Sequence, residues 1–194
     1  MNVLKKFFAG IFLLMIFYAQ ASAMRLELYP QPIGKIFSDD ETFKIEGATK
    51  IKGDFSKGVV LFGDDLYFHF DADRIYNRFG DRDKKNSVEV DTYGETEIYR
   101  IANTAGSDLF LLKKISDDRD AIKVIGLRGG NRIVLLDALD FREKFNIGEN
   151  FQLSKIFTED NKIIFRYTLQ KNIVDVVCRY HAVNEKFYTE AIEQ

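Results

Sequence analysis

The sequence of 194 residues contains no tryptophan, one cysteine, two prolines and two histidines. Because Cys178 has no second cysteine to pair with, an internal disulfide is excluded, and the fold has to be held together by packing alone. Val176 and Tyr180 flank Cys178 at strand spacing, which predicts a small buried hydrophobic residue rather than a reactive thiol. Linkers rich in proline or in glycine and serine are absent as well, so we expect a single domain.

An excess of charge of one sign is also lacking. Acidic and basic residues alternate, as in residues 78–85 (RFGDRDKK), and the formal net charge is −2. It becomes −4 without residues 1–23, which contain two lysines and no acidic residue. A weakly acidic chain without a basic patch has no field that attracts phosphates, so we expect no nucleic-acid partner.

The one long apolar run lies at the N-terminus, where Phe7–Ala19 follows a pair of lysines. The residues after this run are small or mildly polar, and Ala21 and Ala23 have the A-x-A spacing of a signal peptidase site. This pattern predicts a secretory signal peptide over residues 1–23 and a mature chain that begins at Met24.

An uncleaved membrane anchor is the alternative interpretation of this segment. Thirteen apolar residues in a helix span about 20 Å, less than the roughly 30 Å of a hydrocarbon core, although counting on to Ala23 reaches the marginal range. No cysteine follows the small residues, so a lipid-modified N-terminus is not expected. We predict an extracytoplasmic protein, periplasmic or secreted, without a membrane partner after signal cleavage.

Alternation of apolar and polar residues with a period of two dominates the rest of the chain. It predicts strands over residues 163–169, 174–181 and 186–192. Short polar or glycine-containing turns between apolar segments predict three further hairpins, over residues 59–70, 97–113 and 121–136. The last of these has Gly129-Gly130-Asn131 at its turn, where glycines supply the positive φ that tight turns require.

Eight or more short strands about ten residues apart, without long helical crossovers, predict a mainly β fold. We expect an antiparallel β-sandwich or a β-barrel-like single domain over residues 24–194. Two segments are predicted as short helices, residues 71–80 and residues 137–147. In the second of them Phe141 and Phe145 are four residues apart and share one helical face.

Motifs for catalysis, cofactors and metals are missing. The two histidines, His69 and His181, lie on predicted strands, and the odd offset of His181 from Cys178 directs these two side chains to opposite strand faces. Neither a G-x-S-x-G nor a G-x-G-x-x-G pattern occurs. Asp81 and Asp83 resemble the start of a calcium loop, but the later ligand positions are not met. We name no catalytic, cofactor-binding or metal-ligating residue and expect no cofactor.

The leading hypothesis is therefore a non-catalytic extracytoplasmic β domain that binds an unknown small ligand or an envelope protein. A second hypothesis is a hydrolase with an acid-based or metal-assisted site around His69, Asp71 and Asp73. A third is an inhibitor or assembly factor that acts through an exposed edge strand. A cavity of a few hundred Å³ favours a small ligand, whereas a filled core favours protein contacts.

Overall fold

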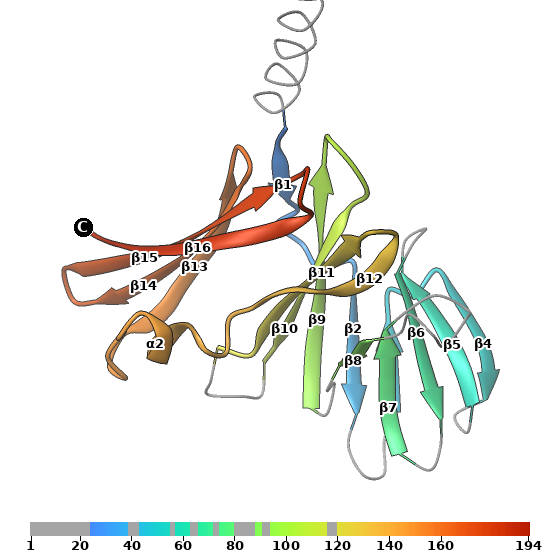
Figure 1. Cartoon of the computed structure of the whole chain (residues 1–194). Coiled ribbons are helices and arrows are strands. Elements are labelled where there is room, and N and C mark those ends of the chain that lie inside the picture. Colours follow the sequence, from blue (N-terminus) through green and yellow to red (C-terminus); the bar gives the residue numbers. More distant parts are fainter. Residues whose placement is uncertain are drawn as a thin grey trace, which may run out of the picture.

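The computed structural model describes residues 24–38, 43–54, 57–62, 66–71, 74–79, 88–90, 94–115 and 120–194. Within these ranges the chain is mainly antiparallel β, as expected, and its single described helix is one turn long. The strands form three sheets, all with antiparallel pairing (Figure 1).

The central sheet has the strand order β12-β11-β10-β9-β2-β3, and β1 pairs with β9 beyond the end of β2. Its strands are β1 (Leu26–Leu28), β2 (Gly34–Ser38), β3 (Phe43–Glu46), β9 (Gly94–Asn103), β10 (Leu109–Lys114), β11 (Ile122–Arg128) and β12 (Asn131–Asp137).

The other two sheets are simple meanders in which each strand pairs with the next. The C-terminal sheet consists of β13 (Gln152–Glu159), β14 (Lys162–Leu169), β15 (Asn172–His181) and β16 (Lys186–Glu193). The remaining sheet consists of β4 (Lys50–Asp54), β5 (Lys57–Phe62), β6 (Leu66–Asp71), β7 (Arg74–Phe79) and β8 (Val88–Val90). The helix α2 (Phe141–Lys144) precedes the C-terminal sheet.

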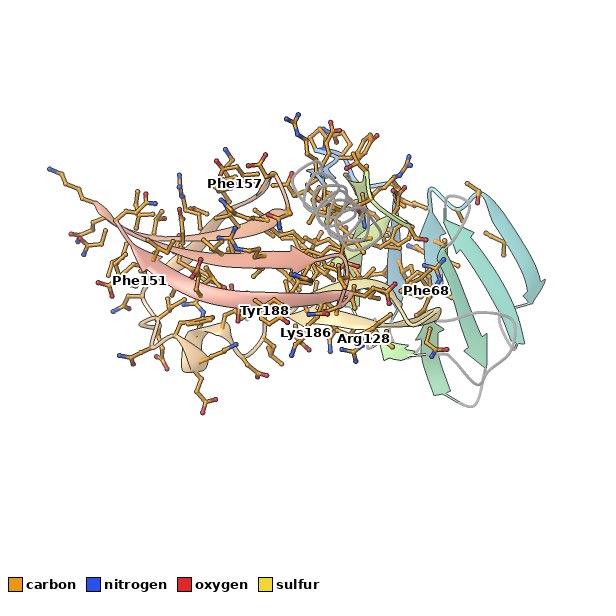
Figure 2. All side chains as sticks on the ribbon, turned by 45° about the horizontal axis from the view of Figure 1, so that its top comes forward. Phe68, Arg128, Phe151, Phe157, Lys186 and Tyr188 are labelled. Carbon is orange, nitrogen blue, oxygen red and sulfur yellow. The ribbon has the colours of Figure 1, made fainter. Side chains whose placement is uncertain are left out.

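The central sheet is the middle layer, because β10 is buried on both of its faces. Leu109 and Leu111 belong to a large core shared with the C-terminal sheet. Phe110 and Leu112 belong to a smaller core that includes Phe68 of β6. Figure 2 labels Phe68 where the central sheet meets the β4–β8 sheet. Successive side chains of a strand point to opposite faces, so the four consecutive apolar residues of β10 pack against a different sheet on each face.

The large core is built from one face of each of two sheets. Ile101, Ile122 and Val124 of the central sheet and Phe165, Tyr167, Val176 and Cys178 of the C-terminal sheet are among its members. The ring of Phe141 in α2 packs edge-on against Phe165, with 5.3 Å between centroids, and so α2 closes one end of this core.

The predicted hairpins are confirmed. β5 pairs with β6, β9 with β10 and β11 with β12, and the three predicted C-terminal strands correspond to β14, β15 and β16. Gly129 and Gly130 have φ values of 58° and 79°, the positive values expected for the β11–β12 turn.

The helix predicted over residues 71–80 is wrong. β6 continues to Asp71, and Arg74–Phe79 form β7, which pairs with both β6 and β8. Ile75, Tyr76 and Phe79 are β-branched or aromatic, and pairing on two edges outweighs the weak propensity of so short a helical pattern. The helix predicted over residues 137–147 is present only as the shorter α2. The rings of Phe141 and Phe145 are nevertheless in contact, with 5.8 Å between their centroids.

The predicted signal peptide, residues 1–23 with Ala21 and Ala23, lies outside the described residues. Met24, the expected first residue of the mature chain, is described, and its side chain is buried in the large core. No helix among the described residues is long and apolar enough to span a membrane.

Candidate functional site: a cleft at the seam between two sheets

Strand β1 joins the central sheet to the C-terminal sheet along a seam. One edge of β1 pairs with β9, and its other edge faces β13 (Figure 1). Across this seam the backbone N–H of Leu26 donates to the carbonyl oxygen of Asp160 at 2.6 Å. The N–H of Leu28 donates to Oγ1 of Thr158 at 3.0 Å. Two hydrogen bonds thus connect the sheets at one end of the seam.

The seam opens at Pro30. In a strand, N–H groups on one edge recur at every second residue, so the donor after Leu26 and Leu28 falls at position 30. Proline has no N–H, and the series of donors ends there. The chain's two prolines, Pro30 and Pro32, both lie in the connection between β1 and β2. Their position turns one continuous strand into two short ones.

The pairing with β9 is irregular at the same place. Leu28 is opposite Ile101 and Gly34 is opposite Ile98, so the five residues 29–33 lie opposite only two residues of β9. The chain stays attached through the N–H of Tyr29, which donates to the carbonyl of Arg100 at 3.0 Å. The extra residues form a bulge beside the open part of the seam.

The facing strand, β13, has a bulge of its own. Leu153 is opposite Tyr167 and Lys155 is opposite Arg166, which leaves Ser154 without a partner in the ladder. The Ser154 hydroxyl donates to the carbonyl oxygen of Arg166 at 3.1 Å. Bulges re-aim side chains and end pairing, and they are common next to binding sites.

A cleft of about 350 Å³ lies between these two irregular stretches. Its lining comes from both sheets and the bulge after β1, and comprises Leu28, Tyr29, Pro30, Tyr99, Leu111, Lys113, Leu153, Ser154, Lys155 and Ile156. Leu111 is a buried member of the large core, and Leu28, Leu153 and Ile156 pack against that core. The cleft therefore reaches the apolar interior at the point where the seam loses its hydrogen bonds.

A row of charges borders the apolar part of the cleft. Lys35, Glu97 and Lys113 lie opposite one another on β2, β9 and β10. The Lys35 ammonium lies 2.9 Å from Oε1 of Glu95 and 3.0 Å from Oε1 of Glu97. The phenol of Tyr99, which lines the cleft, donates to Oε2 of Glu97 at 2.6 Å.

These contacts shift the pKa values of Glu97 and Tyr99. Burial acts to raise the pKa of Glu97, but the hydrogen bonds from Tyr99 and Lys35 and the charges of Lys35 and Lys113 outweigh it, so the pKa lies below its ordinary value. Burial, together with the hydrogen bond to Glu97 and its negative charge, raises the pKa of Tyr99 to about 12. Glu97 is thus an anion and Tyr99 a neutral phenol at neutral pH.

No family model, curated protein or solved structure matches this chain. The cleft is therefore interpreted from its own geometry. Its lining offers apolar surface, two lysines, two tyrosines and one serine. Such a set can bury and orient a small molecule.

The described structure does not test whether the residues of the hydrolase hypothesis come together. His69 and Asp71 lie on β6, where the ladder with β7 shifts register between them, and their side chains lie outside the described part of the structure. Asp73, like Asp81 and Asp83 of the calcium-like segment, lies outside the described residues. Among the residues that are described, no group of three potential metal ligands occurs.

The predictions for Cys178 and His181 are confirmed. Cys178 is fully buried, and His181, three residues later, is exposed, so the two side chains lie on opposite faces of β15. Burial raises the pKa of the Cys178 thiol well above its ordinary value, which keeps the sulfur protonated and unreactive.

The residues of the cleft were missed by the sequence patterns. Leu26-x-Leu28 followed by Pro30-x-Pro32 indicates a strand that ends abruptly, and this was the only available signal. Nothing in it identifies β13 as the strand across the seam, because β13 lies more than a hundred residues away in the chain.

The third hypothesis depends on an edge strand, and the outer edge of β16 lies beside β12 without pairing to it. β16 is the last strand of the C-terminal sheet, and no strand of the described part pairs with its outer edge. Tyr188 and Ile192 on this strand are 48% and 44% exposed (Tyr188 is labelled in Figure 2).

Proposed function

We propose that this protein is a non-catalytic extracytoplasmic binding domain that holds a small, largely apolar molecule in the cleft at the seam. The observation that carries the proposal is the interruption of the seam at Pro30, which leaves Leu111, Leu153 and Ile156 lining a cavity of about 350 Å³. This volume lies within the range of about 300–1,000 Å³ that is typical of small-molecule sites.

The scaffold under this proposal is a single β-barrel-like domain over residues 24–194. Two features support a barrel over an open sandwich. β1 bridges the two sheets on one side of the large core. On the other side β12 lies beside β16, and the N–H of Gly129 donates to Oε2 of Glu185. Small-molecule sites are common at the mouths of β-barrels.

The place of action follows from the N-terminal segment. We propose that residues 1–23 are removed after Ala23 and that the mature chain, beginning at Met24, works in the periplasm or outside the cell without a cofactor, nucleic acid or membrane partner. N-terminal sequencing of the protein isolated from the envelope fraction tests this: a first residue of Met24 is expected. Material that keeps its first residues in the membrane fraction overturns it.

Binding is tested with an uncharged probe, 1-decanol, by isothermal titration calorimetry on the purified full chain. Ser154 is exposed and lies on the cleft wall, so Ser154→Trp introduces bulk there without removing a core residue. Ser154→Ala is the matched control, because it removes the same hydroxyl and adds no bulk. We expect the control to bind like the unmodified chain and Ser154→Trp to lose binding. No binding by the unmodified chain, or equal binding by Ser154→Trp, overturns the proposal.

A second candidate is recognition of an envelope protein by strand addition at β16. No described strand pairs with its outer edge, although β12 lies beside it, and this unpaired edge together with the half-exposed Tyr188 and Ile192 supports the alternative. Ala191→Pro, at an exposed position of the edge strand, removes one N–H and should abolish pull-down of such a partner while leaving 1-decanol binding unchanged. Retained pull-down excludes β16 as the binding edge.

A further inference from the structure

The backbone of β13 offers a second kind of binding group beside the apolar lining of the cleft. In an antiparallel ladder the N–H and C=O of one residue point to one edge of the strand, and those of the next residue point to the other edge. The carbonyl oxygen of Asp160 accepts from the N–H of Leu26 in β1, so the backbone groups of Asp160 point to the seam. By the same alternation those of Thr158 and Ile156 point to the seam as well.

The other strands of the C-terminal sheet give the same orientation for Ile156. The N–H of Tyr180 donates to the carbonyl oxygen of Asn161 at 2.8 Å, so the backbone groups of Asn161 point to β15. Ile164 follows Asn161 by an odd number of residues on β14, and its backbone groups therefore point to β13. Phe157 is opposite Ile164 and exchanges hydrogen bonds with it. The next residue along β13, Ile156, thus points to the seam.

Pro30 leaves the seam edge of β13 without a partner at Ile156. The hydrogen bonds donated by Leu26 and Leu28 advance by two residues along β1 and return by two residues along β13. The next step brings position 30 opposite Ile156, and proline has no N–H to donate. Among the described residues Ile156 makes no backbone hydrogen bond outside its own sheet. Its N–H and C=O are therefore available to a ligand.

The side chain of Ile156 points to the apolar floor of the cleft. Ile156 and Leu153 pack against the large core and line the cleft together with Leu111. Residues that are directly opposite each other in neighbouring strands project from the same face of the sheet. A ligand residue that exchanges both backbone hydrogen bonds with Ile156 therefore directs its own side chain onto Leu111.

The size of the cleft limits the conformation of such a ligand. At about 30 Å³ for each non-hydrogen atom, a volume of about 350 Å³ holds roughly a dozen atoms. One residue with a side chain as large as leucine fits, whereas a helix, about 10 Å across with its side chains, does not. In an extended chain the side chains on either side of this residue point away from the floor.

We propose that the ligand of the cleft is a short peptide in extended conformation, which pairs with β13 at Ile156 and places one apolar side chain on Leu111 and Leu153. This inference rests on the proposed binding function and adds the chemical class of the ligand. An alkyl chain fills the same volume but has no N–H and C=O to offer to Ile156. β1 already lies along the adjoining part of this edge (Figure 1), so the added strand continues an existing interface.

The test uses calorimetric titrations of the purified full chain at pH 7.5 with four uncharged probes. The parent probe is a pentapeptide with blocked termini, which has leucine at its centre and threonine and serine on both sides. The second probe carries a methyl group on the leucine nitrogen, which removes the donor to the carbonyl oxygen of Ile156. The third has alanine in place of leucine, and the fourth is 1-decanol.

We expect the parent peptide to bind at least tenfold more tightly than the N-methylated peptide, because methylation removes one hydrogen bond and blocks close pairing. The alanine peptide should also bind at least tenfold more weakly, because it leaves the apolar floor uncovered. Ser154→Trp, on the cleft wall, should lose the parent peptide, and the matched control Ser154→Ala should keep it. Circular dichroism verifies that both variants fold.

Amide hydrogen exchange, followed by NMR, locates the pairing. The N–H of Ile156 should exchange rapidly in the free chain and at least tenfold more slowly with the parent peptide bound. The N–H of Phe157, which is bonded within the ladder to Ile164, is the internal control and should exchange slowly in both states.

The possible failures are distinguishable. Binding of 1-decanol without binding of the parent peptide overturns the peptide inference and leaves the proposed binding function standing. Equal affinities for the parent and the N-methylated peptide overturn it too, because burial alone then holds the ligand. Protection of the N–H of Ala191 in place of that of Ile156 moves the peptide to the outer edge of β16 and overturns pairing at the seam. A folded chain that binds neither 1-decanol nor the peptide overturns the proposed function itself.

Discussion

Arg166 holds the buried carboxylate of Asp175 with two hydrogen bonds, from Nε to Oδ1 at 2.8 Å and from Nη2 to Oδ2 at 2.7 Å. The two residues lie directly opposite each other on β14 and β15. The Asp175 side chain is only 5% exposed, and Gln194 donates a third hydrogen bond to it at 3.3 Å. A bidentate pair of this kind fixes strand register as well as adding stability.

Asp175→Asn should therefore destabilise the protein by about 2 kcal/mol, because an amide nitrogen would face a guanidinium donor and leave buried donors unsatisfied. The control is Glu190→Gln, in the exposed Arg179–Glu190 pair with 3.7 Å between its charged atoms, which should change stability by less than about 0.5 kcal/mol. Urea unfolding at pH 7 measures both. Equal effects of the two substitutions would contradict the assigned role of Asp175.

Gly47 has no room for a side chain. A Cβ built on Gly47 would lie 2.3 Å from the carbonyl oxygen of Ile33 and 2.8 Å from Cα of Gly34, and the φ of Gly47 is 74°. Gly47→Ala should cost about 3–4 kcal/mol, since a left-handed conformation and a backbone clash add together. Gly130→Ala is the control, because its φ is 79° but a Cβ at this position would meet nothing within 4 Å, and it should cost about 1 kcal/mol. Thermal unfolding of the two variants gives the comparison, and similar midpoints would refute the close approach.

The charge of Glu97 makes stability depend on pH on the acid side. Its pKa is lower in the folded chain than its ordinary value of 4.5, so its contribution is fully present above that value and is lost as the pH falls through the folded pKa. Glu97→Gln should lower stability at pH 7 and reduce the further loss of stability below pH 4.5.

The measurement for Glu97 is a series of urea unfolding curves between pH 7 and pH 3. Glu159→Gln is the control, because Glu159 is largely exposed and its distance to Lys162 is 3.7 Å. Its pH dependence should match that of the unmodified chain. If Glu97→Gln also shows an unchanged pH dependence, the network around Lys35 and Tyr99 does not stabilise the carboxylate.

Cys178 should not react while the protein is folded. Its sulfur is fully buried and burial raises its pKa, so the thiolate that attacks alkylating reagents is not formed. Iodoacetamide at pH 8 should leave the folded chain unlabelled and label one site in 6 M guanidinium, as read by mass spectrometry. Rapid labelling under native conditions would show that the large core opens on the timescale of the reaction.

The hairpins were predictable because their determinants are local. Gly129 and Gly130 specify their turn by their conformational freedom, and the alternation over β14 and β15 assigns each side chain to a face. Residues 74–79 show the limit of such patterns. Their apolar spacing fits both a helix and a strand, and pairing with β6 and β8 decided between the two.

The sequence by itself determined a mainly β fold, the positions of many strands and the buried state of Cys178. Only the tertiary structure decided that β1 faces β13 across a seam, and that Lys113 and Lys155 border the same cleft. The physical reason is the distance along the chain over which each interaction acts. Turn residues and alternation act over a few positions of the chain, whereas the packing of one sheet on another depends on apolar surface from segments far apart in the sequence.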